Sequence, residues 1–366
     1  MNNNELTTYI SESIDKLIIN ALKSMIMNPK EITFLMKYTL SSKKAYKLRM
    51  NYQDTGVHIP AFLISSITTS CNLHCKGCYA RANHMCGEVA CGETLADERW
   101  GELFEEAKNI GISFILLAGG EPLLRKEVIE RASKIDDVIF PIFTNGTIMD
   151  EYYINMFNKN RNLIPVISLE GNEKRTDDRR GLGTHCKIND TMSKLKKAKI
   201  LYGTSITVTT ENFEEVSSNE FIENLRDTDC KIVFFIEYVP ITENTNHLAP
   251  TDKERLYLQQ KQDELRIAYT DMIFLSFPGD EKFTGGCLAA GRGFFHINPY
   301  GGAEPCPFSP YSDCNLKENS LIDALNSPLF KKLKQMELVG GEHDGGCSLF
   351  AHEEEVKQII SGEISK

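Results

Sequence analysis

From residue 60 onward, short apolar runs alternate with amphipathic stretches. The apolar runs are bounded by turn-forming residues and predict six strands, at residues 61–68, 113–118, 138–144, 163–170, 204–210 and 231–238. Apolar residues at helical spacing between them predict helices at residues 95–109, 125–134, 151–159, 188–200 and 216–226. Strand and helix in this alternation predict an α/β fold with a parallel sheet, either open or rolled into a partial (β/α)6 barrel of the TIM type.

Polar residues occupy one face of two later strands in this pattern. Ser168 and Glu170 share a face of the fourth predicted strand, and Ser205 and Thr207 share a face of the fifth. Side chains alternate across a strand, so the apolar neighbours of these residues point the opposite way. Buried polar groups are costly without partners, so polar groups near the strand ends of a barrel predict a binding site there.

The first fifty residues have a different character. Residues 16–49 hold eight basic residues and one acid, a local charge of 8 − 1 = +7, and Asn28 with the following proline predicts a helix start. Apolar residues recur at helical spacing at Leu17, Ile18, Ala21, Leu22, Met25 and Ile26. We predict a basic, amphipathic helical extension over residues 1–56. It either packs on the main domain with its lysines in solvent or contacts a membrane surface through residues 1–50.

Composition excludes several classes of protein. The 366 residues are 41% hydrophobic and 25% charged, which supports a buried core and excludes a disordered chain. The net charge of −10 disfavours nucleic-acid binding. No apolar run approaches the ~18 residues that span a membrane, and the N-terminus has no basic leader. We therefore expect a cytoplasmic protein, with peripheral membrane contact as the alternative.

The eleven cysteines are the exception to this plain composition. An odd number without a secretion signal argues against a disulfide framework and favours metal ligands. Cys71, Cys75 and Cys78 lie within eight residues, directly after the first predicted strand. With a fourth ligand from elsewhere, three such thiolates hold a zinc ion or a four-iron cluster. Without one, an iron keeps open positions for a substrate or cofactor.

This C-x3-C-x2-C segment resembles that of the radical S-adenosylmethionine (SAM) enzymes. The resemblance implies a [4Fe-4S] cluster on Cys71, Cys75 and Cys78, with SAM on the remaining iron. It also implies that an electron from an external donor, such as flavodoxin or ferredoxin, cleaves SAM, and that the 5′-deoxyadenosyl radical abstracts hydrogen from a substrate. The family usually has an aromatic residue directly before the third cysteine. Gly77 stands there instead, and Tyr79 is the candidate to supply the ring.

Further segments match the family in order along residues 60–240. A Gly-Gly-Glu-Pro turn follows the second predicted strand, where the family contacts the SAM amino group, and an arginine after the fourth strand resembles one that pairs with the SAM carboxylate. A simple turn and a solvated arginine are the respective alternatives. The expected cofactor contacts are Tyr79, Gly119, Gly120, Glu121, Pro122, Asn145, Ser168, Glu170, Arg180 and Thr207.

A second cysteine group lies toward the C-terminus. Cys287, Gly301 and Cys306 form C-x13-G-x4-C, which resembles the SPASM or shorter Twitch extension of radical SAM enzymes. The resemblance implies one auxiliary [4Fe-4S] cluster on Cys287, Cys306 and Cys347. Cys314 is expected as its fourth ligand, and a structural zinc on the same thiols is the alternative.

Other residues near these thiols remain candidates. His343 and Asp344 are alternative ligands, and Asp280 and Glu281 are weak candidates for catalytic bases, with ordinary surface acids as the alternative. For the remaining cysteines, we expect loop thiols at Cys86 and Cys91 and buried, inert residues at Cys186 and Cys230. The histidines, among them His58 and His296, give no interpretable pattern.

These expectations combine into one prediction. The chain has a helical extension (1–56), a radical SAM partial barrel (57–245) and a small SPASM/Twitch-like iron–sulfur domain (246–366). It is an oxidoreductase that functionalises a C–H bond of a peptide or another natural-product precursor. A lipid or isoprenoid-like substrate at a membrane is one alternative, and a non-enzymatic iron–sulfur or zinc protein is the other. The glycine-rich turn at 119–122 favours the enzyme, because an electron carrier needs no pocket for a second ligand.

Overall fold

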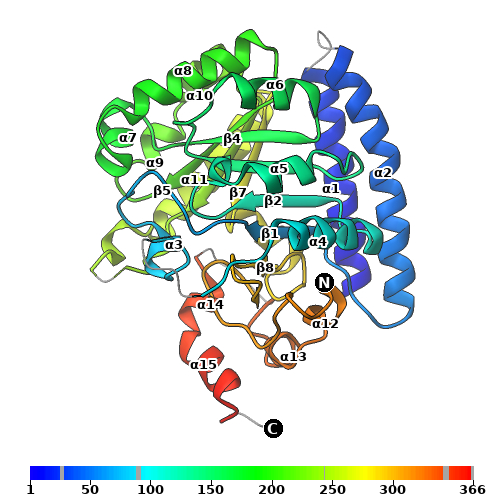
Figure 1. Ribbon diagram of the computed structural model, residues 1–366. Helices are drawn as coiled ribbons and strands as arrows, with labels where there is room; N and C mark the ends of the chain where they lie inside the picture. Colours follow the sequence, from blue (N-terminus) through cyan, green and yellow to red (C-terminus); the bar gives the residue numbers. More distant parts are fainter. Residues whose placement is uncertain (25–28, 88–91, 243, 341–345, 364–366) are drawn as a thin grey trace.

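A parallel sheet that curls into a half-barrel forms the centre of the computed structural model (Figure 1). The structure describes residues 1–366 except 25–28, 88–91, 243, 341–345 and 364–366, and the side chains of residues 17–28 are also left undescribed. The strands are β1 (Phe62–Ser66), β2 (Phe114–Ala118), β3 (Phe140–Thr144), β4 (Leu163–Leu169), β5 (Gly203–Val208), β6 (Ile232–Glu237), β7 (Ile273–Phe277), β8 (His296–Ile297) and β9 (Ala303–Glu304).

The predicted α/β alternation is confirmed. The first six strands lie where the apolar runs predict them, and each pairs in parallel with the next. The predicted helices correspond to α4 (Asp97–Ile110), α5 (Lys126–Ala132), α6 (Glu151–Lys159), α8 (Thr184–Lys197) and α10 (Asn219–Asp227). α4 illustrates the cause, because Trp100, Leu103, Phe104 and Ala107 recur on one face and are buried against the sheet.

The sheet extends beyond the six predicted strands at both edges. β7 pairs with β6, and β8 pairs in parallel with β1 while β9 returns antiparallel beside it. α11 (Asp252–Ala268) makes the connection from β6 to β7 and begins with a capping box formed by Thr251 and Glu254. Residues beyond 245 therefore complete the sheet, and the division at residues 56 and 245 remains a prediction.

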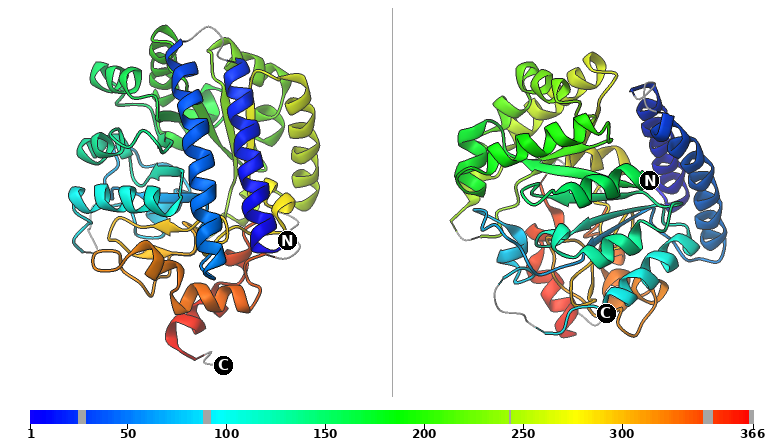
Figure 2. Two further views of the ribbon diagram at one scale, coloured as in Figure 1. Left: turned by 90° about the vertical axis from the view of Figure 1, so that its right-hand side faces the viewer. Right: turned by 45° about the horizontal axis from the view of Figure 1, so that its top comes forward.

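The N-terminal extension consists of α1 (Asn3–Ser24) and α2 (Pro29–Asp54), which lie side by side against the barrel (Figures 1 and 2). Their buried residues meet the first residues of the strands in one apolar cluster, so they cover the N-terminal end of the barrel. The members from the helices are Leu6, Ile10, Ile14, Phe34, Leu35 and Tyr38. The Tyr38 hydroxyl also donates to the carbonyl of Ser113 at 2.9 Å.

This packing confirms the interpretation in which the extension covers the main domain, as far as the side chains are described. The apolar positions at 17–26 that motivated the membrane interpretation lie outside the described side chains. Lys43, Lys44 and Lys47 are exposed, as expected for lysines in solvent. In the described part of the chain, no helix is both long and apolar enough to cross a bilayer.

Short elements complete the chain. The connections of the barrel contain α3 (Tyr79–Ala82), η1 (Pro122–Leu124), α7 (Glu173–Arg180), α9 (Phe213–Val216) and η2 (Asn246–Leu248). The C-terminal part contains η3 (Gly279–Thr284), α12 (Leu321–Leu325), α13 (Pro328–Gln335), α14 (Ser348–Ala351) and α15 (Glu353–Ser361). It lies below the sheet in Figure 1, next to β8.

Candidate functional site

The first three cysteines lie on the loop that connects the C-terminal end of β1 to α3. Cys71, Cys75 and Cys78 are half-buried, and Cys78 is the residue from which α3 starts. Burial raises the pKa of the Cys75 thiol, the Arg180 guanidinium opposes this, and the other two thiols add to it, so all four groups are close neighbours.

The arrangement of these thiols does not suit a single metal ion. No three ligating side chains in the described residues converge on one metal ion. A four-iron cluster binds each thiolate through a different iron, so its ligands need not converge on one point.

Two glycines at the end of β2 allow this cysteine loop to lie against the sheet. The amide of Gly120 donates to the carbonyl of Thr68 at 2.8 Å, and the amide of Glu121 donates to the carbonyl of Ser70 at 2.7 Å. A Cβ on Gly119, whose φ is 134°, would lie 2.6 Å from the Thr68 oxygen. A Cβ on Gly120 would lie 2.1 Å from the Ser70 oxygen. The glycines thus permit a backbone approach that other residues exclude.

The Glu121 side chain joins the C-terminal ends of β2 and β3 through hydrogen bonds. Its carboxylate is 1% exposed and accepts from the Thr144 hydroxyl at 2.6 Å, the Asn145 amide at 2.7 Å and the Leu123 amide at 3.1 Å. Burial raises the pKa of this carboxyl, and the three hydrogen bonds oppose the shift. Both oxygens already have donors, so the carboxylate holds β2 to β3, and its expected contact with the cofactor stays a prediction. Pro122 begins η1 beside it.

Asn145 joins the end of β3 to the cysteine loop. Its side-chain amide donates to the Asn72 side chain at 2.9 Å, next to Cys71. On the neighbouring strands, the Ser168 and Ser205 hydroxyls lie 3.3 Å apart, and Thr207 is half-buried two residues further along β5. The predicted polar face therefore exists.

Glu170 and Arg180 form a buried ion pair beside the thiols. Arg180 donates to one Glu170 oxygen through Nε at 2.8 Å and Nη2 at 2.5 Å. The other Glu170 oxygen is buried and has no hydrogen-bond partner among the described residues. The end of α7 is joined to the cysteine loop, because the Lys76 amide donates to the Arg179 carbonyl at 2.9 Å. A buried carboxylate oxygen without a donor fits a site that receives an added polar ligand.

Tyr238 occupies the space in front of Gly77. It follows β6, is 5% exposed, and its hydroxyl has no hydrogen-bond partner in the described structure. Gly77 has φ 64°, and a Cβ there would lie 2.6 Å from the Tyr238 oxygen. An aromatic ring therefore does lie in front of Gly77, but it belongs to a residue 161 positions later in the chain, which sequence spacing could not reveal.

Tyr79, the expected source of that ring, points elsewhere. Its ring packs edge-on against Phe308 with centroids 5.3 Å apart. Near this ring, the Ser66 hydroxyl lies 2.8 Å from Nε2 of His296, whose Nδ1 lies 2.7 Å from Glu304. Buried hydrogen bonds thus join the β8–β9 hairpin to the C-terminal end of β1. Nothing in the sequence pattern distinguishes His296.

The second cysteine group contains three of the four expected thiols. Cys287, Cys306 and Cys347 are close enough to influence one another electrostatically. Burial raises the pKa of Cys347 to about 11 and the pKa values of the other two well above the ordinary range. Glu281 is buried beside them, and burial raises its pKa to about 8.

Cys314 lies apart from this group. The charged neighbours of its thiol are Asp313 and Asp323, and its carbonyl accepts from the Ala303 amide at 2.9 Å. Its place as the fourth ligand therefore stays a prediction, because the electrostatic neighbours of its thiol do not include the other three cysteines. His343 and Asp344 lie outside the described residues.

The remaining candidates are Asp280 and the four cysteines outside the two cysteine groups. Asp280 is ion-paired with Arg266 at 2.8 Å, so it is not a free base. Cys86 lies in a loop as expected, and it is buried in one small cluster with the cysteine loop. Cys230 is buried as expected, but Cys186 is exposed on α8, so that prediction is wrong. Cys91 is outside the described residues.

Comparison with known proteins identifies one domain of the chain. The model of the radical SAM superfamily matches residues 65–222, which span the cysteine loop, the glycine pair and the Glu170–Arg180 pair. The chain contains a radical SAM domain over these residues. It is an enzyme, like the curated radical SAM proteins that it resembles.

Two relatives and one solved structure illustrate this similarity. The AdoMet-dependent heme synthase of Methanosarcina barkeri is 25% identical over 329 residues, covering 83% of this chain and 90% of that protein. The sporulation killing factor maturation protein SkfB of Bacillus subtilis is 27% identical over 280 residues, covering 74% of this chain and 66% of SkfB. The structure of Streptococcus suis SuiB bound to its precursor peptide SuiA has a TM-score of 0.62 at 16% identity, covering 84% of this chain and 72% of SuiB. At that identity, the structural similarity establishes the shared fold.

Proposed function

We propose that this radical SAM enzyme abstracts a hydrogen atom from a peptide substrate. The observation that carries the catalytic part is the surroundings of the first three thiols. A buried Glu170 oxygen and the buried Tyr238 hydroxyl lack partners in the described structure, and Arg180 lies next to Cys75. Three thiols with unsatisfied polar groups beside them suit an iron–sulfur cluster that binds a polar second ligand.

The residues present fit that pair of groups. Cys71, Cys75 and Cys78 would hold the [4Fe-4S] cluster, and Arg180 with Glu170 would hold charged and hydroxyl groups of SAM. Together the cluster and SAM supply a 5′-deoxyadenosyl radical, with the electron coming from a donor such as flavodoxin or ferredoxin. The chain's own part is to seat the cysteine loop through Gly120 and Asn145.

We propose an auxiliary [4Fe-4S] cluster on Cys287, Cys306 and Cys347. Three buried thiols that come together from separate parts of the chain support it, since they form a set of ligands for a cluster. Cys314 is omitted from the proposed ligands because its neighbours are two carboxylates. A structural zinc is the competing proposal, but it would need these thiols to converge on one ion, which they do not do in the described structure, and the iron count distinguishes the two.

Similarity to SkfB and the fold of SuiB support a peptide substrate, since SkfB is named a maturation protein and SuiB binds a precursor peptide. A heme precursor is the second candidate, because the heme synthase aligns over 329 residues. A membrane-held lipid is no longer proposed, because the described apolar face of α1 and α2 is buried against the barrel.

Anaerobic reconstitution tests the catalytic proposal. We expect about eight iron atoms per chain, as two cubanes, and formation of 5′-deoxyadenosine after reduction with SAM. Cys75→Ala should abolish SAM cleavage, whereas Cys186→Ala, an exposed cysteine on α8, should leave it unchanged. SAM cleavage at the wild-type rate in Cys75→Ala contradicts the proposal.

Deuterium transfer tests the substrate class. Wild-type enzyme is incubated with uniformly deuterated precursor peptides or with deuterated porphyrins, and the 5′-deoxyadenosine is examined by mass spectrometry. Label from peptide alone supports the first candidate, and label from porphyrin alone supports the second.

A further inference from the structure

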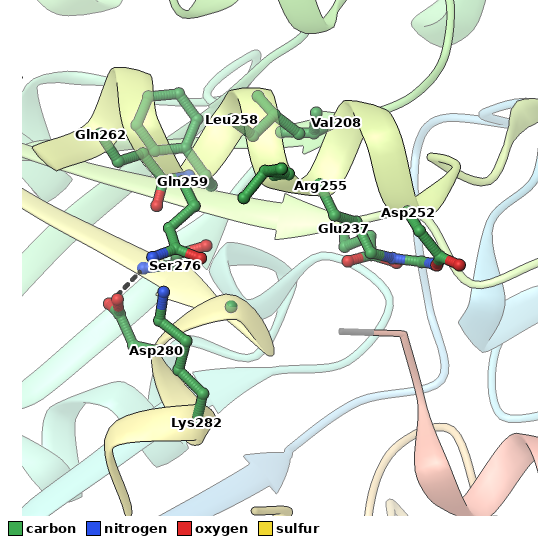
Figure 3. A pocket seen from close by; sticks show the side chains of 13 residues that line it. Val208, Glu237, Asp252, Arg255, Leu258, Gln259, Gln262, Ser276, Asp280 and Lys282 are labelled. Carbon is green, nitrogen blue, oxygen red and sulfur yellow. Dashed lines mark hydrogen bonds and ion pairs between the residues drawn. The ribbon is translucent and has the colours of Figure 1, made fainter. Parts of the chain in front are cut away.

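A cavity of about 310 Å³ lies on the outer side of the sheet, between α11 and the strands β6 and β7 (Figure 3). Phe234 of β6 packs against Phe143 of β3, with ring centroids 5.1 Å apart, so Phe234 faces the inside of the barrel. Alternation along the strand therefore directs Phe235 outward, into the wall of this cavity. The cavity is thus separate from the barrel interior, and the proposed chemistry does not use it.

One part of the cavity wall is apolar. Phe235 is buried, and Val208 and Leu258 lie on the same surface. Leu256, although 57% exposed, also contributes to the lining. This wall offers contact to a hydrocarbon group, and the cavity volume is within the range of small-molecule sites.

The carboxylates around the cavity are already neutralised. Glu237 accepts from Arg255 Nε at 2.7 Å and Nη2 at 2.6 Å, and Asp252 accepts from Nη1 of the same arginine at 2.8 Å. Asp280 accepts from Arg266 at 2.8 Å. None of these acids is therefore free to receive a cationic ligand.

Four other side-chain donors around the cavity, in contrast, have no hydrogen bond in the described structure. Gln262 is only 4% exposed, and its amide has no hydrogen bond in the described structure. Among the described residues, the Gln259 amide and the Ser276 hydroxyl also have no partner. The Lys282 ammonium has no ion pair there either, and its one contact is the ring of Phe283, 4.6 Å away. In Figure 3 the Lys282 amine extends toward the side of the cavity where Ser276 and Gln259 lie.

We propose that this cavity binds a carboxylate group carried on an apolar body. An ammonium, two amides and a hydroxyl with no other partner form a donor set for an anion, and the apolar wall receives the attached hydrocarbon. A monoanion fits better than a phosphate dianion, because Lys282 is the single cation among the described lining residues whose charge is not already paired with a carboxylate. The carboxylate belongs either to a free organic acid or to an acidic peptide side chain.

The cavity has a connection to the second cysteine group. Glu237 forms part of its wall and also accepts from the Gly346 amide at 3.4 Å, and Gly346 precedes Cys347. A ligand in the cavity would therefore lie one side chain away from the loop that carries the proposed auxiliary ligand. This connection does not depend on the identity of the main substrate.

Calorimetric titration of the full-length, reconstituted enzyme tests the proposal. The probes are sodium octanoate and its cationic counterpart octylamine. A second pair consists of a capped leucine–glutamate–leucine tripeptide and its glutamine counterpart. We expect saturable binding of octanoate or of the glutamate peptide, and no binding of octylamine or the glutamine peptide. The probe that binds distinguishes the two sources of the carboxylate.

Substitutions of lining residues test whether the carboxylate probe binds in this cavity. Lys282→Gln should weaken binding of the carboxylate probe by about tenfold or more, because a charged hydrogen bond is lost. Gln262→Glu, which keeps the shape but adds a negative charge, should weaken it at least as much. Lys261→Gln on the same helix, where Lys261 is paired with Glu264, is the matched control and should bind as wild type. Circular dichroism establishes that each variant is folded.

Two results would overturn the proposal. The first is the absence of saturable binding of either carboxylate probe up to roughly 10 mM, which is weaker than specific recognition. The second is unchanged affinity in folded Lys282→Gln, since binding would then occur elsewhere. Neither result depends on SAM cleavage, so failure of this site and failure of the proposed function are separable.

Discussion

Replacing Gly120 by alanine probes how the cysteine loop is held. The added Cβ would lie 2.1 Å from the Ser70 oxygen, 2.6 Å from the Ser70 carbonyl carbon and 3.2 Å from the Cβ of Cys71. Gly120 does not have a left-handed φ, so the effect is steric and not conformational. Attractive contact between heavy atoms needs roughly 3.5 Å, so the loop must move by about 1.4 Å.

The size of the effect follows from what this movement breaks. A loop that stays in place suffers overpacking of roughly 1–3 kcal/mol. A loop that moves loses the 2.7 Å hydrogen bond from Glu121 to Ser70, worth about 1 kcal/mol, and displaces Cys71. Since the second route costs less, we expect a folded enzyme whose free energy of unfolding falls by about 1 kcal/mol and whose first cluster is lost.

The assay is anaerobic reconstitution of Gly120→Ala, with iron content, 5′-deoxyadenosine yield and thermal unfolding measured on the same sample. Iron should fall from about eight to about four atoms per chain, the contribution of one cubane, and 5′-deoxyadenosine should disappear. Gly87→Ala is the matched control, because a Cβ there meets nothing within 4 Å and its φ is not left-handed. Wild-type iron content and turnover in Gly120→Ala would show that close backbone approach does not seat the loop.

Three further predictions concern other parts of the molecule. Cys347→Ser should lose about four iron atoms per chain, which is the content of one cubane, whereas Cys314→Ser should keep them. Equal loss of iron in both variants would show that Cys314 is also a ligand. Tyr238→Ala should weaken SAM binding by about tenfold, as measured by the change in the electron paramagnetic resonance spectrum on SAM addition. Tyr238→Phe should separate the effect of the ring from that of its hydroxyl, which has no partner in the described structure. Unchanged affinity in both variants argues against a role for this ring. Burial lowers the pKa of His58 to about 4 from 6.5, so the folded state binds fewer protons than the unfolded state between these values. Stability should therefore fall as the pH drops from 6.5 to 4, by up to about 3 kcal/mol, and His58→Gln should show a shallower decline in chemical denaturation.

The location of the elements could be predicted because their signals are local. Six strands and five helices follow from the period of apolar residues, which depends only on neighbours in the chain. The three-cysteine loop and the glycine pair could be predicted for the same reason, since each occupies a few consecutive residues between elements. The start of α2 is also a local property, because the helix begins at Pro29 as the sequence predicts.

Contacts between distant segments were decided only by the tertiary structure. Tyr238 lies over Gly77, and His296 reaches Ser66, because parallel strands bring together residues that are 161 and 230 positions apart. Cys314 has the spacing of a ligand, but the charged neighbours of its thiol are Asp313 and Asp323 and not the other thiols. The sequence by itself therefore determined the order of elements and the thiol-bearing loops. The folding of the sheet determined which side chains meet at the site, because such contacts depend on strand register and closure and not on local spacing.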